Sequence, residues 1–149
     1  MPFKINTIIQ KSLIYQAGNG RFFDQAYKKG TLVREQEFNS DELIVLKSIN
    51  DIKKYNVTDN ELIHFCHSIP NNHDSNNYIY LNRPPMVTNH SSDPNIYYVY
   101  SDKKRTYTLR DVKKGEEMYQ DYKSFSEVKW FTDYLKNKHN EKWAKHLFD

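Results

Sequence analysis

Short runs of β-branched and aromatic residues, separated by glycines and polar turn residues, fill most of this chain and constrain the fold that it can adopt. Runs of this length and composition favour strands. They lie at residues 8–15, 21–26, 31–37, 78–81, 96–100 and 105–109. Gly18, Gly20 and Gly30 fall between the first three runs, where the backbone must turn. The sequence therefore predicts a mainly β fold.

Two stretches between these runs have helical spacing. Ser40 can cap a first helix. This helix would carry an apolar stripe on one face, formed by Leu43, Leu46 and Ile49. Residues 58–61, Thr-Asp-Asn-Glu, have the spacing of a capping box and predict a second short helix. We therefore expect a helical insertion at about residues 40–68, followed by an exposed polar loop at 70–77.

A C-terminal helical segment is predicted at about residues 126–148. Ser126 can cap its helix. The apolar face of this helix would consist of Val128, Phe131 and Leu135. A last turn would carry Trp143 and Leu147. Strands, a helical insertion and a helical tail together predict the α+β class.

The length of 149 residues fits one domain, with a core at about residues 8–122. We expect the whole chain, residues 1–149, to form this domain. A single cysteine, Cys66, excludes an internal disulfide and every zinc site with several cysteines. We therefore predict no metal.

The sequence predicts an intracellular protein, in the nucleus or the cytoplasm. The N-terminus lacks the apolar core of a signal peptide. No run approaches the ~18 apolar residues of a membrane span. We therefore expect no membrane association.

The formal net charge of +3 is unevenly distributed. Residues 1–34 carry six Lys/Arg and one Asp, whereas residues 35–61 carry three Lys and seven Asp/Glu. The acidic block can receive a lysine-rich peptide, or it can be the solvated face of a helix. The basic termini leave nucleic-acid binding open as an accessory property, but no function predicted here requires it.

Three segments of the chain resemble signature segments of one enzyme family in their order and spacing. The first is Gly-Asn-Gly-Arg-Phe-Phe at residues 18–23, and the second is Asn-His-Ser-Ser-Asp-Pro-Asn at residues 89–95. The third runs from residue 108 to residue 122 and contains Gly-Glu-Glu-Met. Together they resemble the SET-domain protein lysine methyltransferases. The type resembled is compact, with a single domain and no zinc-binding flanking modules.

The resemblance implies a β-clip fold and a cofactor. In this fold the Asn-His segment threads beneath the segment that ends in the catalytic tyrosine, which forms a pseudoknot. The implied cofactor is S-adenosyl-L-methionine. Backbone groups of Gly18, Asn19 and Gly20 would hold it. Asn89 and His90 would contact its amino-acid and adenine portions.

Aromatic residues complete the site that the resemblance implies. Tyr122 would be catalytic and would contact the cofactor beside the transferred methyl group. Tyr98 would line a narrow channel for the target lysine. Phe125 or Trp130 would stack against the adenine ring.

The chemistry of methyl transfer explains these residue types. The reaction is an in-line displacement, so the protein must align the lysine nitrogen with the methyl carbon and the sulfur. The lysine must be neutral to attack, and a narrow apolar channel disfavours its charged form. Tyrosine hydroxyls supply oriented dipoles without competing as nucleophiles. The expected partner is a lysine-containing protein, either a histone tail or a non-histone protein.

Two other functions remain open from the sequence. Gln36 and Met86 differ from the residues that many family members have at these positions, which leaves a non-catalytic SET-like module that binds proteins or regulates transcription. A cysteine hydrolase could use Cys66 with His64 or His67. Close neighbours on one helix do not converge their side chains well, which disfavours the hydrolase.

Overall fold

The computed structural model describes residues 3–68 and 77–138 of the chain. The predicted polar loop therefore lies almost entirely outside the described residues. The predicted last turn with Trp143 and Leu147 also lies outside them.

The contacts divide the chain into two compact units, each made of two separate segments. The first unit contains Met1–Glu37 and Met86–Asp121, and the second contains Phe38–Pro85 and Tyr122–Asp149. The expectation of a single domain over residues 1–149 stays a prediction.

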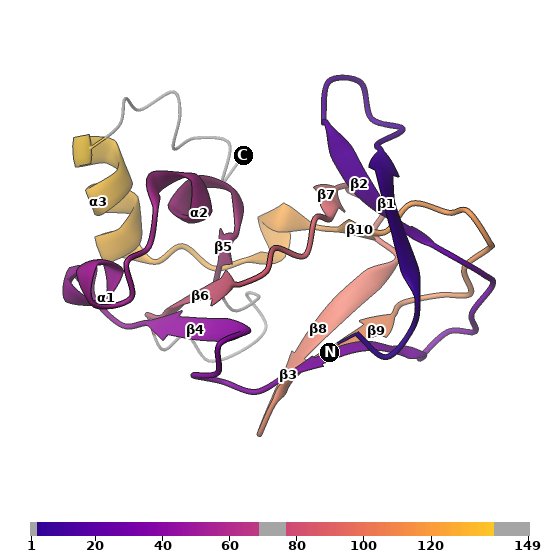
Figure 1. The fold of residues 1–149 in the computed structure, drawn as a ribbon, viewed down its shortest axis with the longest axis horizontal. Coiled ribbons are helices and arrows are strands. Elements are labelled where there is room, and N and C mark those ends of the chain that lie inside the picture. The colour runs from indigo at the N-terminus through magenta and orange to yellow at the C-terminus, as the bar shows by residue number, and fades with distance from the viewer. Residues whose placement is uncertain (1–2, 69–76, 139–149) are drawn as a thin grey trace. The chain divides into compact units, whose positions relative to one another are not determined.

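In its described residues the first unit consists of strands and loops (Figure 1). An antiparallel hairpin joins β1 (Thr7–Lys11) to β2 (Asn19–Phe23). The other edge of β2 bonds to the segment at 115–118, because the Phe23 amide donates to the Glu116 carbonyl at 2.9 Å and the Met118 amide donates to the Arg21 carbonyl at 2.7 Å. With neighbours on both edges, β2 is central, and Phe22 and Phe23 are buried.

A three-stranded antiparallel sheet forms the rest of the first unit, together with one short parallel pair. The sheet has the order β3-β9-β8, with strands at Leu32–Gln36, Lys104–Thr108 and Ile96–Tyr100. The short strands β7 (Asn89–His90) and β10 (Tyr119–Gln120) pair in parallel. Parallel neighbours need a long connection, and here it contains β8 and β9.

The second unit has a small sheet and all the helices of the described chain. Its sheet has the order β4-β6-β5, with strands at Leu43–Leu46, Ile79–Asn82 and Cys66–His67. Its helices are α1 (Ile49–Lys54), α2 (Asp59–His64), the short 3-10 helix η1 (Tyr122–Ser124) and α3 (Lys129–Lys138). The apolar faces of α1, α2 and α3 share one core with β4 and β6, formed by Ile44, Leu46, Ile52, Val57, Leu62, Ile79, Leu81, Val128, Phe131 and Leu135.

The predicted α+β class, mainly β, is confirmed by these elements. β8 has the predicted bounds, and β6 and β9 agree with theirs to within a residue. The first two runs are shifted, because Leu13 to Tyr15 belong to the hairpin connection and β2 already begins at Asn19. No helix within residues 3–68 and 77–138 combines the length and the hydropathy that a membrane crossing requires.

The predicted helix after Ser40 is wrong at its start. Residues Leu43–Leu46 form β4, and all four side chains are buried. A continuous apolar run in a strand covered on both faces can place leucines three residues apart by chance, so periodicity alone does not separate it from a helix. The helix begins only at Ile49. The insertion at residues 40–68 is therefore partly β, since β5 ends it.

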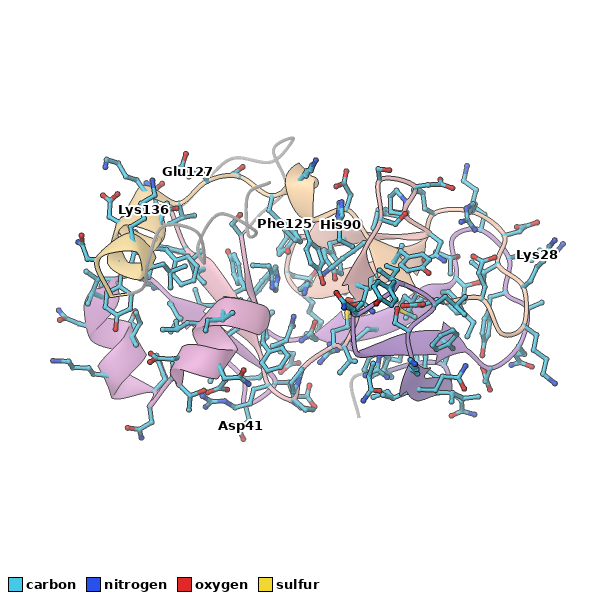
Figure 2. All side chains as sticks on the ribbon, turned by 90° about the horizontal axis from the view of Figure 1, so that it is seen from above. Lys28, Asp41, His90, Phe125, Glu127 and Lys136 are labelled. Carbon is cyan, nitrogen blue, oxygen red and sulfur yellow. The ribbon has the colours of Figure 1, made fainter. Side chains whose placement is uncertain are left out.

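The predicted cap at Ser126 is also wrong, although the helix that it was meant to start is present. α3 begins at Lys129, and the amides of Phe131 and Thr132 donate to the Val128 carbonyl at 3.1 and 3.0 Å. The predicted apolar face is confirmed, because Val128, Phe131 and Leu135 are buried. Lys136 is exposed and points away from the ribbon (Figure 2).

The predicted capping box at Thr58 is present in full. The Glu61 amide donates to the Thr58 hydroxyl at 3.2 Å, and the Thr58 amide donates to the Glu61 carboxylate at 3.1 Å. The same carboxylate holds the Arg83 guanidinium at 2.8 Å. Glu61 thus completes the capping box and also forms an ion pair within the second unit.

Replacing the capping threonine tests how much this box contributes. We expect Thr58→Ala to lower the free energy of unfolding by about 1 kcal/mol, because an amide at the start of α2 loses its acceptor. Ser48→Ala is the matched control, because Ser48 is the cap residue of α1 and makes no side-chain cap bond. Urea denaturation of both variants measures the difference. Equal losses would contradict the assignment.

Candidate functional site

The parallel pairing of β7 with β10 brings two of the three predicted motifs side by side. Asn89 lies opposite Tyr119, and His90 lies opposite Gln120. The Ser91 amide continues the ladder with a bond to the Gln120 carbonyl at 3.1 Å. The threading that would make this pair a pseudoknot stays a prediction.

The side chain of Asn95 is buried, with 0% exposed, and it links the same two motifs through hydrogen bonds. Its Nδ2 donates to the Glu117 carbonyl at 2.7 Å and to a Glu116 carboxylate oxygen at 2.8 Å. Its Oδ1 accepts from the Tyr119 amide at 2.8 Å. The last residue of the Asn-His segment is therefore structural, because it fixes the course of the Gly-Glu-Glu segment.

Glu117 is the centre of the site, and the sequence did not single it out. It is 1% exposed and accepts bonds from three parts of the first unit. The donors are the Ser12 hydroxyl at 2.7 Å, the Leu13 amide at 2.8 Å, the Asn89 Nδ2 at 3.0 Å and the Tyr119 hydroxyl at 3.1 Å. A charged residue in a Gly-Glu-Glu turn is expected at the surface. The position of Glu117 within the motif was therefore the one sign in the sequence that it belongs to the site.

These donors decide the ionisation of Glu117. Burial alone raises the pKa of its carboxyl, but the bonds from Asn89, Leu13, Ser12 and Tyr119 favour the charged form and lower the pKa below its usual value. The pKa of the Tyr119 phenol moves the other way, to about 12, through burial and its bond to Glu117. Glu117 is therefore an ionised acceptor at neutral pH.

The predicted glycine turn lies against this carboxylate. A Cβ on Gly20 would stand 2.3 Å from Oε2 of Glu117, so no larger residue fits there without a shift. The Asn19 carbonyl accepts from the Asn89 Nδ2 at 3.1 Å. Gly18 has φ +74, a conformation that favours glycine, and nothing lies within 4 Å of a Cβ placed there. The structure thus brings the predicted residues at 18–20 together with Asn89.

His90 lies beside this cluster with its side chain about a third exposed (Figure 2). Its Nδ1 is 3.6 Å from a carboxylate oxygen of Asp121. A carboxylate at this nitrogen favours an orientation in which Nε2 faces away from Asp121. Asp121 is a second residue that sequence reasoning did not assign.

Tyr98 lies on a buried face of the β3-β9-β8 sheet that is unusually polar. The Tyr98 hydroxyl donates to Oε1 of Gln120 and approaches the Met86 sulfur at 3.5 Å. In the sheet register, Tyr98 and Arg34 flank Thr106, and Gln36 lies opposite Lys104. Tyr98, predicted to line the lysine channel, and Gln36, one of the two departures from the family, therefore share one face of the sheet.

Two basic side chains, Arg34 and Lys104, are fully buried on this face. The Lys104 Nζ lies 4.2 Å from the centroid of the Tyr98 ring, and the Arg34 Cζ lies 4.7 Å from that of Phe3. Burial, and secondly the positive charge of Arg34, lower the pKa of Lys104 well below its usual value. Sequence reasoning missed both residues, since in alternating strands they resemble ordinary surface charges.

Tyr122 and Phe125 belong to the second unit. Tyr122 begins η1 two residues after β10, and the Phe125 amide donates to the Tyr122 carbonyl at 3.4 Å. The Phe125 ring packs on His67 with centroids 5.5 Å apart. The Trp130 Nε1 donates to the Asn77 carbonyl at 2.7 Å. Their predicted roles beside the methyl group and the adenine stay predictions.

The structure argues against a cysteine hydrolase. Burial raises the pKa of the Cys66 thiol far above its usual value, and the charge of Glu61 acts in the same direction. A thiol in this state is a poor nucleophile. The His67 ring packs against Tyr80 and Phe125 at 5.7 and 5.5 Å, as an ordinary core residue would. Within the described residues no group of His, Cys, Asp and Glu side chains could hold a metal ion.

Comparisons with known proteins show the family and the fold of the chain. The SET domain family matches residues 16–123. No curated protein matches the chain. The fold of this chain is similar to that of part of the solved structures of Chaetomium thermophilum Polycomb Repressive Complex 2. The autoinhibited form bound to S-adenosylmethionine has a TM-score of 0.59 at 18% identity, over 90% of this chain and 17% of that one.

Two further structures show the same fold. The Chaetomium complex bound to GSK126 has a TM-score of 0.60 at 18% identity, over 89% of this chain and 17% of that one. A Plasmodium falciparum protein, named provisionally as a histone methyltransferase, has a TM-score of 0.51 at 17% identity, over 80% of this chain and 94% of that one. The chain thus spans a small part of the Chaetomium protein and nearly the whole length of the Plasmodium protein.

The role of Glu117 can be tested by removing its charge. We expect Glu117→Gln to lower the free energy of unfolding at pH 7 by about 1–3 kcal/mol, because an amide nitrogen would face buried donors. The wild type should lose this contribution as the pH falls below 4.5, the usual value, since a lowered pKa stabilises only the charged form. Urea denaturation at pH 7 and pH 3 measures both effects. The exposed Glu127 (Figure 2) provides the control Glu127→Gln, and an equal loss in that variant would refute the assignment.

The buried amine of Lys104 gives a pH dependence of the same sign in a higher pH range. Below the usual pKa of 10.5 the unfolded chain holds a proton on Lys104, which the folded chain releases at a much lower pH. Stability should therefore rise with pH between these two values. We expect Lys104→Met to remove this rise and Lys103→Met, at a partly exposed neighbour, to keep it. Thermal unfolding between pH 6 and pH 10 measures the slopes, and parallel slopes in all three proteins would contradict a buried Lys104.

Proposed function

Because the chain belongs to the SET-domain family, we propose that it is an S-adenosylmethionine-dependent protein lysine N-methyltransferase. The observation that carries the proposal is the junction at Glu117. This carboxylate binds the hairpin connection and Asn89, and the Asn89 amide binds the Asn19 carbonyl at 3.1 Å. Asn19 and Asn89, two of the residues that the family motif assigns to the cofactor, are thus joined beside one buried charge.

The open turn at residues 18–20 fits the proposed cofactor. Gly18 and Asn19 are exposed, and the space around a Cβ on Gly18 is free, so a ligand can approach the backbone at these residues. We assign Gly18, Asn19 and Gly20 to backbone contacts and Asn89 and His90 to side-chain contacts. When bound, S-adenosylmethionine supplies the activated methyl group.

On the substrate side we assign two tyrosines. Tyr122 would orient a hydroxyl dipole toward the reacting centre, as the motif implies, and Tyr98 would line the lysine channel. The bond from the Tyr98 hydroxyl to Gln120 supports this role, because it fixes the ring on a buried face. Phe125 would close the cofactor side. The substrate would be an intracellular lysine-containing protein, and histone tails are the first class to test.

A non-catalytic SET-like binding module is the second candidate. Gln36 and Met86 favour it, because both are buried and differ from the residues that many family members have at these positions. Calorimetry with S-adenosylmethionine separates the two candidates. Cofactor binding together with turnover excludes the module, whereas the absence of binding excludes the enzyme.

The catalytic assignment predicts the effect of removing the hydroxyl oxygen of Tyr122. We expect Tyr122→Phe to lower the rate of radiolabelled methyl transfer to histones or to a cell lysate by about 10²–10³-fold, because an oriented hydroxyl is lost. Tyr15→Phe, at an 87% exposed tyrosine, should leave the rate unchanged.

The cofactor assignment predicts a different defect. His90→Ala should weaken calorimetric binding of S-adenosylmethionine and abolish transfer at low cofactor concentration, since a proposed contact is removed. A Tyr122→Phe protein with wild-type turnover, or a His90→Ala protein with wild-type cofactor affinity, would show that the motif residues do not have the assigned roles.

A further inference from the structure

The hairpin of β1 and β2 carries most of the exposed apolar surface of the described chain. Eight large apolar side chains are exposed, and five of them lie between residues 8 and 15. They are Ile8, Ile9, Leu13, Ile14 and Tyr15, with Leu13 and Tyr15 76% and 87% exposed. Exposed apolar groups concentrated in one short segment mark an interaction site more often than scattered ones do.

The outer edge of β1 also has free backbone groups. The Ser12 amide donates to the Gly18 carbonyl at 2.8 Å, and the antiparallel register then makes Ile8 and Gln10 the residues that bond to β2. Thr7, Ile9 and Lys11 therefore direct their backbone N–H and C=O groups away from β2. No backbone bond among the described residues closes this edge.

The outer edges of β2 and β3 are covered, unlike that of β1. The 115–118 segment bonds to the outer edge of β2. Phe3 forms a bridge with Arg34, and the Lys4 amide donates to the Val33 carbonyl at 2.8 Å, so the chain itself covers the edge of β3. Figure 1 shows the connecting residues of the indigo hairpin extending beyond the ends of β1 and β2.

The charge of this segment selects the partner. Between residues 3 and 23 the only charged side chains are Lys4, Lys11 and Arg21, and all are cations. Arg21 is buried, and its guanidinium binds the Met86 carbonyl and the Thr7 hydroxyl, whereas Lys4 and Lys11 are exposed. Cations at both ends of β1 attract a segment with carboxylates and repel a second copy of the same hairpin.

We propose that the outer edge of β1 docks an extended, acidic and partly apolar segment of a partner protein, which adds a strand to the hairpin. The main-chain groups of Thr7, Ile9 and Lys11 supply the ladder bonds. The isoleucines at 8 and 9 lie on opposite faces of the hairpin, and the alternate apolar side chains of the added strand pack against the isoleucine on their own face. Carboxylates of the partner pair with Lys4 and Lys11.

A cyclic β-hairpin peptide tests this docking with the full 149-residue chain. One strand of the probe alternates valine and glutamate, and a matched probe alternates valine and lysine; closing the ring reduces the ordering cost of binding. We expect the glutamate probe to bind about tenfold more tightly or better, and to slow hydrogen exchange at the amides of Thr7, Ile9 and Lys11. NMR spectroscopy measures both effects.

Three variants make the test specific. Lys11→Glu should remove or reverse the preference for the glutamate probe, whereas Lys53→Glu, at an exposed lysine on α1, should not. Ile9→Pro deletes an outward N–H and should block binding. Slow exchange at the Ile8 and Gln10 amides in that variant would show that the hairpin itself is intact.

Four results would overturn the proposal. They are equal affinity for the two probes, binding of neither probe at millimolar concentration, slow exchange at the three amides in the free monomer, and a dimer whose formation protects them. The third would mean that the chain covers its own edge, and the fourth that the partner is a second copy. None of these readouts uses the cofactor or a lysine substrate, so the docking surface and the proposed methyl transfer stand or fall separately.

Discussion

The buried carboxylate of Glu117 is the interaction on which the first unit depends. It has four donors, drawn from the hairpin connection, the Asn-His segment and β10. Segments about a hundred residues apart in the chain therefore meet at two oxygen atoms. A buried charge is tolerated only when its hydrogen bonds are satisfied, so the loss of one donor weakens every contact at the junction. Gly20 is required at this point because a side chain there would overlap the carboxylate.

Asn95 extends this junction to the other end of the motif. It holds the Gly-Glu-Glu segment through bonds to the Glu117 carbonyl and from the Tyr119 amide. The Glu116 carboxylate accepts bonds from both Asn95 and Arg110. Two of the motif residues, Asn95 and Glu117, thus have a structural role, and they leave the exposed Gly18 and Asn19 and the partly exposed His90 to meet a ligand. The proposed cofactor half of the site is rigid for this reason. The hairpin beyond it ends in the exposed edge of β1, which we assign to a different partner.

Local rules succeeded where one local interaction decides the structure. The capping box at Thr58 and the apolar face of Val128, Phe131 and Leu135 follow from spacing alone. They failed at Leu43–Leu46, where burial on both faces gave a helical spacing to a strand. The order of the motifs located the candidate site. The buried positions of Glu117, Arg34 and Lys104 could not be predicted, because residues of these types usually lie at the surface. Only the tertiary contacts reveal that these three side chains are buried.

The central claim is that the turn at residues 18–20 and the pair Asn89 and His90 form one cofactor site beside a lysine channel. A crystal structure of the chain with S-adenosylmethionine tests it most directly. We predict the cofactor in contact with the backbone of residues 18–20 and with the side chains of Asn89 and His90, its methyl group facing a channel lined by Tyr98 and Tyr122. A cofactor bound elsewhere, or crystals grown at saturating cofactor that contain none, would contradict the claim.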